Sequence, residues 1–242
     1  MPHKIRKTSP IPDASREWIE NSFKWLIDRF GEQNIRTRRI LTPHHSDFPI
    51  RYNGQPSTAQ ETLNIVATQM EVDPASIHLE LYDEGNVVLS GDIYLKQYQT
   101  LNYAAGRYFG KEEDGKYHIW LEQRQLNQPE KMVATLAHEI AHIKLLGEGA
   151  IEKNDEPLTD LTTIVFGLGI FNANACFQFY KGFDGSGHSS LGYLTQQEWG
   201  YGLALLALFR KEPEADWIQL LTKNIRSDIA KSIEYIMENK AD

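Results

Sequence analysis

The chain has 242 residues, of which 41% are hydrophobic and 24% are charged, and its formal net charge is −8. This composition is typical of a folded globular protein with a sizeable core and excludes a largely disordered chain. The acidic balance argues against broad binding to nucleic acid or to an anionic membrane surface. We therefore expect neither a nucleic-acid partner nor a membrane partner.

Cysteine content and hydropathy predict the compartment. The single cysteine, Cys176, lies in an apolar run and has no partner for an intramolecular disulfide. The basic N-terminal residues are not followed by the apolar stretch of a signal peptide, and no window approaches 18 continuous apolar residues. The sequence therefore predicts a soluble, cytoplasmic protein.

The first hundred residues predict helices mixed with strands. Proline followed by aspartate marks a helix start near residue 13, and alternation of apolar and polar side chains marks the strands. The expected elements are a helix from Asp13 up to Gly31, a strand over 35–41, a helix over 58–70, a strand over 77–82 and a second strand over 87–95.

The remainder predicts two strands followed by helices. The expected elements are strands over 104–109 and 116–121, a helix over 131–146 that stops at Gly147, a helix over 157–180, a Gly/Ser loop over 182–192, a helix over 195–210, and one or two further helices. Strands in front and helices behind predict an α+β fold.

One segment carries a metal-binding pattern. His138-Glu139-Ile140-Ala141-His142 matches H-E-x-x-H on the helix expected over 131–146. Residues four apart share a helix face, so both imidazoles can converge on one ion. Glu139 lies about 100° round the helix, where it can reach a metal-bound water. The opposite stripe is apolar and consists of Val133, Leu136, Ile140 and Ile143.

A hydrolytic zinc site needs a third protein ligand and an open fourth position. The metzincin extension is excluded, because its glycine and histidine positions hold Leu145 and Glu148. Glu156 opens the next expected helix fourteen residues beyond His142, and Asp160 lies one turn later on the same face. The opposite assignment, with Asp160 as ligand and Glu156 as its support, stays open. Further carboxylates near this place are Glu148, Glu152 and Asp155.

H-E-x-x-H followed by E-x-x-x-D, over about residues 117–165, resembles the gluzincins, the thermolysin-like zinc metallopeptidases, in a compact form. The resemblance implies Zn2+ held by His138, His142 and Glu156, with Glu139 as general base and Asp160 orienting His138. It also implies that the strand 117–122 is an edge strand that pairs with an extended peptide substrate; an ordinary strand of the sheet is the alternative interpretation. The implied fold is a single zincin-like domain over 1–242, with an N-terminal α/β portion (1–100) and a catalytic core with C-terminal helices (101–242).

The chain departs from the larger gluzincins in two ways. The spacing from the second histidine to the glutamate is short, and the downstream histidine or tyrosine motif that stabilises the oxyanion is not recognisable. His188, Tyr193 and Tyr201 are the candidates for that role, and each also has an ordinary structural explanation.

These observations predict a zinc-dependent hydrolase that cleaves peptide bonds in a peptide or protein substrate. One alternative is a non-peptidase or inactive zincin-fold protein with a binding or regulatory role. Another is a helical interaction protein in which H-E-x-x-H is accidental. The oligomeric state and the cleavage preference are left open.

Overall fold

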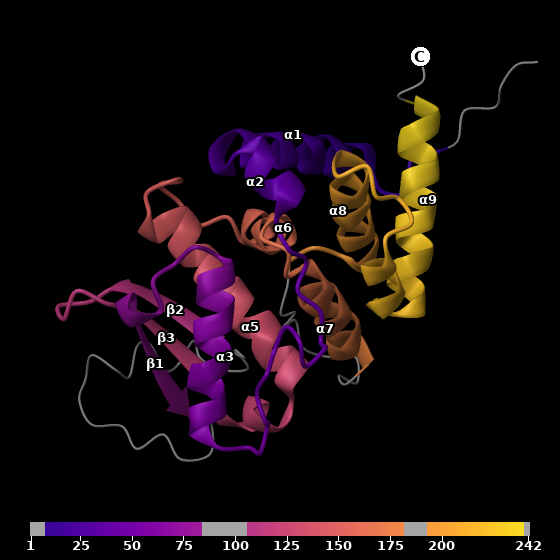
Figure 1. Cartoon of the computed structure of the whole chain (residues 1–242). Coiled ribbons are helices and arrows are strands. Elements are labelled where there is room, and N and C mark those ends of the chain that lie inside the picture. The colour runs from indigo at the N-terminus through magenta and orange to yellow at the C-terminus, as the bar shows by residue number, and fades with distance from the viewer. Residues whose placement is uncertain (1–7, 84–105, 182–192, 240–242) are drawn as a thin grey trace, which may run out of the picture. The chain divides into compact units, whose positions relative to one another are not determined.

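The computed structural model describes residues 8–83, 106–181 and 193–239 (Figure 1). These residues form eight α-helices and a three-stranded mixed sheet, which confirms the α+β class. Contacts between α-carbons divide the chain into two compact units: one comprises 1–42, 156–180 and 192–242, and the other comprises 43–155 and 181–191. No helix in the described part of the chain has the length and apolar character needed to cross a bilayer.

The sheet belongs to the unit that contains residues 43–155. Its strands are β1 (Ile77–Tyr82), β2 (Gly106–Lys111) and β3 (Tyr117–Glu122), in the order β1-β3-β2. Strand β3 pairs in parallel with β1 and antiparallel with β2. The expectation that 117–122 is an edge strand was therefore wrong. This strand is central because it pairs with β1 on one side and β2 on the other, and its side chains Ile119 and Leu121 are fully buried.

Two long helices pack in the same unit. Helix α3 (Pro56–Gln69) contacts α5 (Pro129–His142), and α5 also contacts β2. Proline in the first turn and Glu130 beside it set the start of α5. Proline lacks an N–H group, and an N–H in the first turn would have no carbonyl partner within the helix. An acidic side chain suits the positive end of the helix. Every residue from Met132 to His142 is buried, so the face that carries the histidines is buried like the apolar stripe.

The end of α5 differs from the expectation. The α-helix stops at His142 and continues as a π-helical turn over Ile143–Gly147, in which the Glu148 N–H donates to the Ile143 carbonyl over 2.8 Å. Gly147 was predicted to be the residue just past the helix end, but its φ is not positive; the left-handed residue is Gly149, with φ 69°. Glycine suits this position for another reason, since a β-carbon on Gly147 would collide with the ring of Tyr117 and crowd the hydroxyl of Tyr108.

The other unit is helical. Helix α8 (Gln196–Phe209) packs against α9 (Lys223–Asn239) and α1 (Asp13–Phe30), and α1 packs against α6 (Glu156–Val165) (Figure 1). Thr195 and Glu198 form a reciprocal capping box that fixes the start of α8. The other helices in this part of the described chain are α2 (Glu32–Thr37) and α7 (Gly169–Lys181).

The prediction of a strand over 35–41 is wrong. Residues 32–37 form α2, and 38–41 have no regular secondary structure. Glu32 and Arg36 are one turn apart and form an ion pair of 2.7 Å, which favours the helix. Ile35 is the only buried residue of α2, so the apparent alternation did not reflect a half-buried strand.

The single helix expected over 157–180 is two helices, α6 and α7. The chain turns at Gly167, whose φ is 78°. The Gly167 N–H donates to the Ile164 carbonyl, and the Leu168 N–H donates to the Thr163 carbonyl, which is the Schellman pattern of a helix end. A left-handed residue stops the helix there. The expected strand over 87–95 and the Gly/Ser loop over 182–192 lie outside the described residues.

Candidate metal centre

His138 and His142 lie one turn apart on α5 and contact each other. Their ring centroids are 4.9 Å apart, and the rings meet edge to face at 87°. Only 8% of His138 and 6% of His142 is exposed. Buried imidazoles need partners for their ring nitrogens, because an unpaired buried polar group costs free energy.

The third group is the carboxylate of Glu156, the first residue of α6. One ligand atom from each of His138, His142 and Glu156 lies within 4.8 Å of the other two. Glu156 is partly buried, and it occupies the first turn of its helix, where the helix dipole favours a negative charge. The sequence predicted these three residues as the ligand set, and the structure brings them together.

The donor set fits zinc. Two imidazole nitrogens and one carboxylate oxygen are a ligand combination of hydrolytic zinc sites. Ligand atoms at ordinary zinc distances in a tetrahedral arrangement are about 3.4 Å apart. The three ligand atoms, which lie within 4.8 Å of one another, therefore need only a small side-chain adjustment to bind one ion.

Glu139 is buried beside the histidine pair, with 3% of its surface exposed. Its carboxylate lies against Gly106, the first residue of β2: a β-carbon built on this glycine would lie 3.1 Å from Glu139 Oε1. The backbone of β2 thus passes directly beside the predicted general base. Sequence reasoning missed Gly106, although a glycine inside a predicted strand is a signal for close approach of another group.

Tyr108 is a second neighbour that sequence reasoning missed. Its ring stacks on the His142 imidazole, with centroids 5.8 Å apart and planes at 13°. Burial raises the pKa of Tyr108 to about 12, and the nearby Tyr117 contributes a smaller part of this rise. The Tyr108 hydroxyl therefore stays protonated at neutral pH. The two-residue period of β2 places Gly106 and Tyr108 on the same face of the strand, toward α5.

Asp160 is almost fully buried in α6, one turn after Glu156. Its Oδ2 atom accepts hydrogen bonds from the backbone N–H groups of Tyr193 (2.7 Å) and Leu194 (3.2 Å). This carboxylate therefore fixes the chain just before α8. The role that the resemblance implies for it, orienting His138, stays a prediction. In the described residues the metal-competent cluster contains Glu156 and not Asp160, which favours Glu156 as the ligand.

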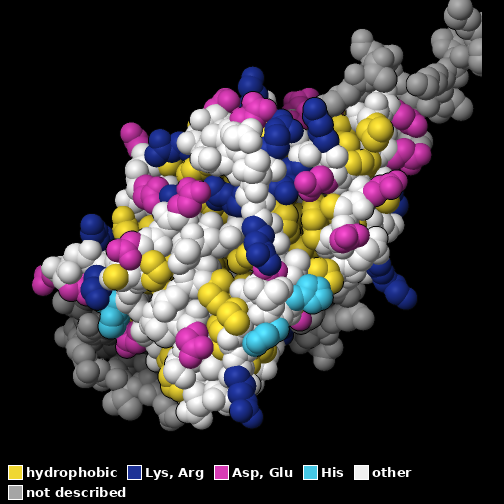
Figure 2. All heavy atoms as spheres, in the orientation of Figure 1, with side chains coloured by type: hydrophobic (Ala, Val, Ile, Leu, Met, Phe, Trp, Pro, Cys, Tyr) yellow, Lys and Arg dark blue, Asp and Glu magenta, His cyan; other side chains and the backbone are white. Residues whose placement is uncertain are grey.

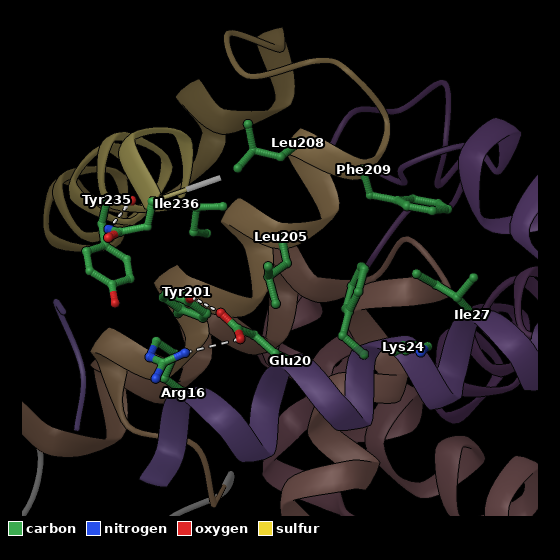
Figure 3. Close-up of a pocket in the computed structure, with 12 residues that line it drawn as sticks. Arg16, Glu20, Lys24, Ile27, Tyr201, Leu205, Leu208, Phe209, Tyr235 and Ile236 are labelled. Atoms are coloured by element: carbon green, nitrogen blue, oxygen red, sulfur yellow. Dashed lines mark hydrogen bonds and ion pairs between the residues drawn. The ribbon is translucent and has the colours of Figure 1, made fainter. Parts of the chain in front are cut away.

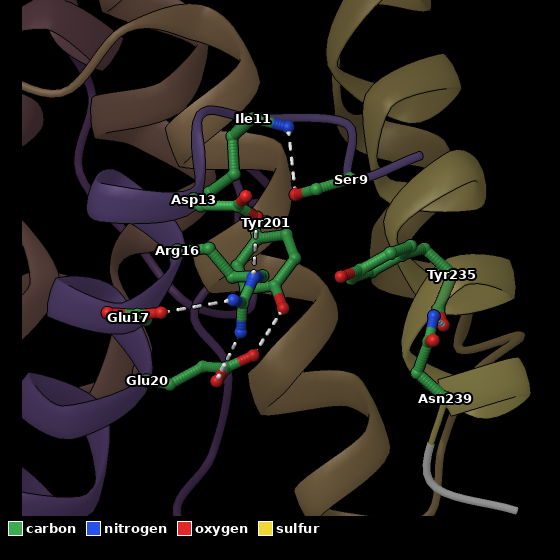
Figure 4. A network of polar contacts seen from close by, with 9 residues as sticks. All are labelled: Ser9, Ile11, Asp13, Arg16, Glu17, Glu20, Tyr201, Tyr235 and Asn239. Carbon is green, nitrogen blue, oxygen red and sulfur yellow. Dashed lines mark hydrogen bonds and ion pairs between the residues drawn. The ribbon is translucent and has the colours of Figure 1, made fainter. Parts of the chain in front are cut away.

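The oxyanion candidates differ in their surroundings. Tyr201 is fully buried on α8 and donates its hydroxyl to Glu20 of α1 over 2.5 Å; burial, and then this bond, raise the pKa of its phenol. Glu20 also pairs with Arg16, which contacts Asp13 and Glu17 (Figure 4). Tyr193 is 55% exposed, and His188 lies outside the described residues.

Tyr201 also lines a cavity of about 460 Å³ formed by α1, α8 and α9 (Figure 3). Apolar side chains such as Leu205 and Phe209 share this lining with Arg16 and Glu20, which pair with each other. The cavity is a feature of the helical unit, and Tyr201 has a structural role there.

Charged side chains of both signs are interspersed over the visible face, with no large field of either sign (Figure 2). No protein-family model, curated protein or solved structure matches the chain. The resemblance to the gluzincins accordingly rests on the motif and its spacing alone.

Proposed function

We propose that this protein is a zinc-dependent hydrolase that cleaves amide bonds in peptides. The observation that carries the proposal is the convergence of ligand atoms from His138, His142 and Glu156 within 4.8 Å. Glu139, adjacent to the first of these histidines in the sequence, supplies the base that such a site requires.

Glu139 takes up one proton and gives it back. Its carboxylate accepts a proton from the water molecule that attacks the amide carbonyl and then delivers it to the leaving nitrogen. The products are a carboxylic acid and an amine, and the carboxylate of Glu139 is regenerated. Burial of Glu139 serves this exchange, because little bulk water competes for the proton.

The ligand set determines the charge at the site. Two neutral imidazoles and one carboxylate leave a divalent ion with a net positive charge. A bound zinc ion supplies Lewis acidity and brings the pKa of a coordinated water toward neutrality. Because His138, His142 and Glu156 would supply only three ligand atoms, a bound zinc could also take a water molecule.

Strand β2 supports a peptide as the substrate. It is at the edge of the described sheet, and its first residue lies against Glu139. An extended peptide can add to the edge of a sheet through main-chain hydrogen bonds. In this proposal β2 takes the place that the resemblance assigned to the strand 117–122.

Metal quantification on purified variants tests the ligand set. We expect one zinc per chain in the wild type and loss of zinc in His138→Ala, His142→Ala and Glu156→Gln. His118→Ala is the matched control, since His118 pairs with Asp114 over 3.1 Å and is outside the cluster. A wild type without stoichiometric zinc, or a Glu156→Gln variant that binds zinc as tightly as the wild type, would overturn this ligand set.

A second measurement tests the chemistry. Glu139→Gln should keep its zinc and lose hydrolysis of a fluorogenic peptide library by about 10²- to 10⁴-fold, because the amide cannot accept the proton. Unchanged turnover in Glu139→Gln would refute the mechanism. A zinc-loaded wild type that cleaves no peptide would refute the proposed peptidase activity and favour the alternative of a non-peptidase or inactive binding protein.

A further inference from the structure

We propose that Tyr108 is a positioning residue that fixes the plane of the His142 imidazole by stacking on it, and so sets the affinity of the site for its metal. This inference rests on the proposed metal-binding function. It assigns no proton transfer to Tyr108.

The contact geometry is that of an offset stack. The planes of Tyr108 and His142 are 13° from parallel, and their centroids are 5.8 Å apart, within the range of favourable aromatic pairs. His138 meets the same imidazole edge to face at 87°. The His142 ring therefore has an aromatic neighbour against its plane and a second one at a right angle.

Tyr108 is itself held in place by Tyr117. The two rings are 6.2 Å apart, and the Tyr117 hydroxyl donates a 3.1 Å hydrogen bond to the carbonyl of Gly147. A β-carbon on Gly147 would lie 2.7 Å from Tyr117 Cε1 and 3.1 Å from the Tyr108 hydroxyl oxygen. The missing side chain of Gly147 thus gives both tyrosines room against the turn that follows His142.

An irregularity in the hairpin contributes to this placement. Tyr108 pairs with Ile119, whereas Lys111 pairs with Tyr117, so the register shifts between Tyr108 and Lys111. A β-bulge re-aims the side chains next to it and often lies beside a functional site. The shift sets Lys111, rather than residue 110, opposite Tyr117.

Ring orientation matters because an imidazole nitrogen offers its lone pair in the plane of the ring. Rotation of the ring turns that lone pair away from the ion. Residues that orient a metal ligand typically change metal affinity by about 10- to 100-fold when they are removed. The stack requires the tyrosine ring and not its hydroxyl, which separates this role from that of a proton donor.

The test measures zinc affinity by competition with a chromophoric chelator, the absorption spectrum of the cobalt-substituted protein, and unfolding of the metal-free protein. Tyr108→Phe should match the wild type in all three. Tyr108→Leu should weaken zinc binding by about 10- to 100-fold and shift the cobalt bands. Tyr108→Met, which has a flexible unbranched side chain and no flat ring, should do the same and provides a second variant should the first not fold.

Tyr52→Leu is the matched control. Tyr52 is a partly buried tyrosine of the same unit that contacts Thr62 and lies outside the metal cluster. Its removal should destabilise the metal-free protein and leave the zinc affinity and the cobalt spectrum unchanged.

The outcomes separate the two proposals. A wild type that binds no zinc refutes the proposed function. A wild type that binds zinc, with Tyr108→Leu and Tyr108→Met showing unchanged affinity and spectra, refutes the positioning role alone. Equal losses in Tyr108→Phe and Tyr108→Leu refute it too, because the ring would then not be the cause.

Discussion

Gly106 and Glu139 are in such close contact that a β-carbon on the glycine would lie 3.1 Å from the glutamate's Oε1 and equally close to its Cγ. The same β-carbon would overlap Thr135 Cγ2. A strand that starts with any other residue would have to move away from α5 or displace the Glu139 carboxylate.

Gly106→Ala should therefore affect both stability and turnover. We expect a loss of about 1–3 kcal/mol in the free energy of unfolding, the usual cost of overpacking, together with slower peptide hydrolysis. Denaturant unfolding and turnover of the zinc-loaded variant measure the two effects.

The double variant Gly106→Ala/Thr135→Ser separates them. It removes the methyl group that the new β-carbon overlaps, so it should recover stability, while the contact with Glu139 keeps hydrolysis low. Full activity of the double variant would contradict the assigned role of this contact.

Asp160→Ala should destabilise the protein by about 1–3 kcal/mol, because it removes the acceptor of two backbone N–H groups, those of Tyr193 and Leu194. Asp160→Asn keeps one side-chain oxygen and should lose less stability. Thermal unfolding compares the two variants. Their zinc affinities test the orienting role toward His138: a loss in Asp160→Asn at near-native stability would support that role, and no loss would refute it.

Cys176 should react slowly with thiol reagents in the native protein. Burial, and then the nearby Asp160 carboxylate, raise the pKa of this thiol to about 11 from its usual value near 9. At pH 8 this lowers the thiolate fraction by about 100-fold, and only the thiolate is a nucleophile. Comparing the rate of disulfide exchange in native protein and in guanidinium measures the effect.

The same shift makes stability depend on pH. The folded protein keeps the Cys176 proton up to about pH 11, whereas the unfolded chain releases it near pH 9. This contribution to stability is therefore complete below pH 9 and is lost between pH 9 and pH 11. Cys176→Ala should flatten the loss of stability across that interval, and an unchanged pH profile would contradict the assigned pKa.

Gly167→Ala should cost about 1–2 kcal/mol, because φ is 78° at this position and a β-carbon is disfavoured in the left-handed region. Gly167→Asn should cost less, since asparagine tolerates this conformation. Chemical denaturation of both variants against the wild type checks the order. Equal stabilities would show that the turn between α6 and α7 does not depend on the glycine.

The elements predicted well were those with local signals. The start of α5 follows from Pro129 and Glu130, and the start of α8 follows from Thr195 and its capping partner Glu198. Alternation identified β1 because one of its faces is more buried than the other.

The elements predicted poorly depend on distant partners. The basic residues of 35–41 suggested a strand, but Arg36 stacks over Phe209 and Arg38 over Phe166, with the guanidinium carbons 4.2 and 4.1 Å from the ring centroids. Neither contact can be read from local periodicity.

The candidate site shows the same division. The spacing of His138 and His142 on a helix predicted their convergence, and the motif pattern selected Glu156 as the third residue. Gly106 and Tyr108 were missed because their nearness to Glu139 and His142 depends on where the β2–β3 hairpin meets α5. No local pattern encodes that register.

The π-helical turn over Ile143–Gly147 changes the direction in which the residues after it point, relative to the helix that carries the histidines. A wider turn holds one residue more than an α-helical turn, which corresponds to about 100° of rotation. Deleting one residue from this turn would leave His138 and His142 in phase with each other. It would rotate the position of Gly147 away from the tyrosine rings and present a side chain in its place, so the turn length matches the helix to the hairpin beside it.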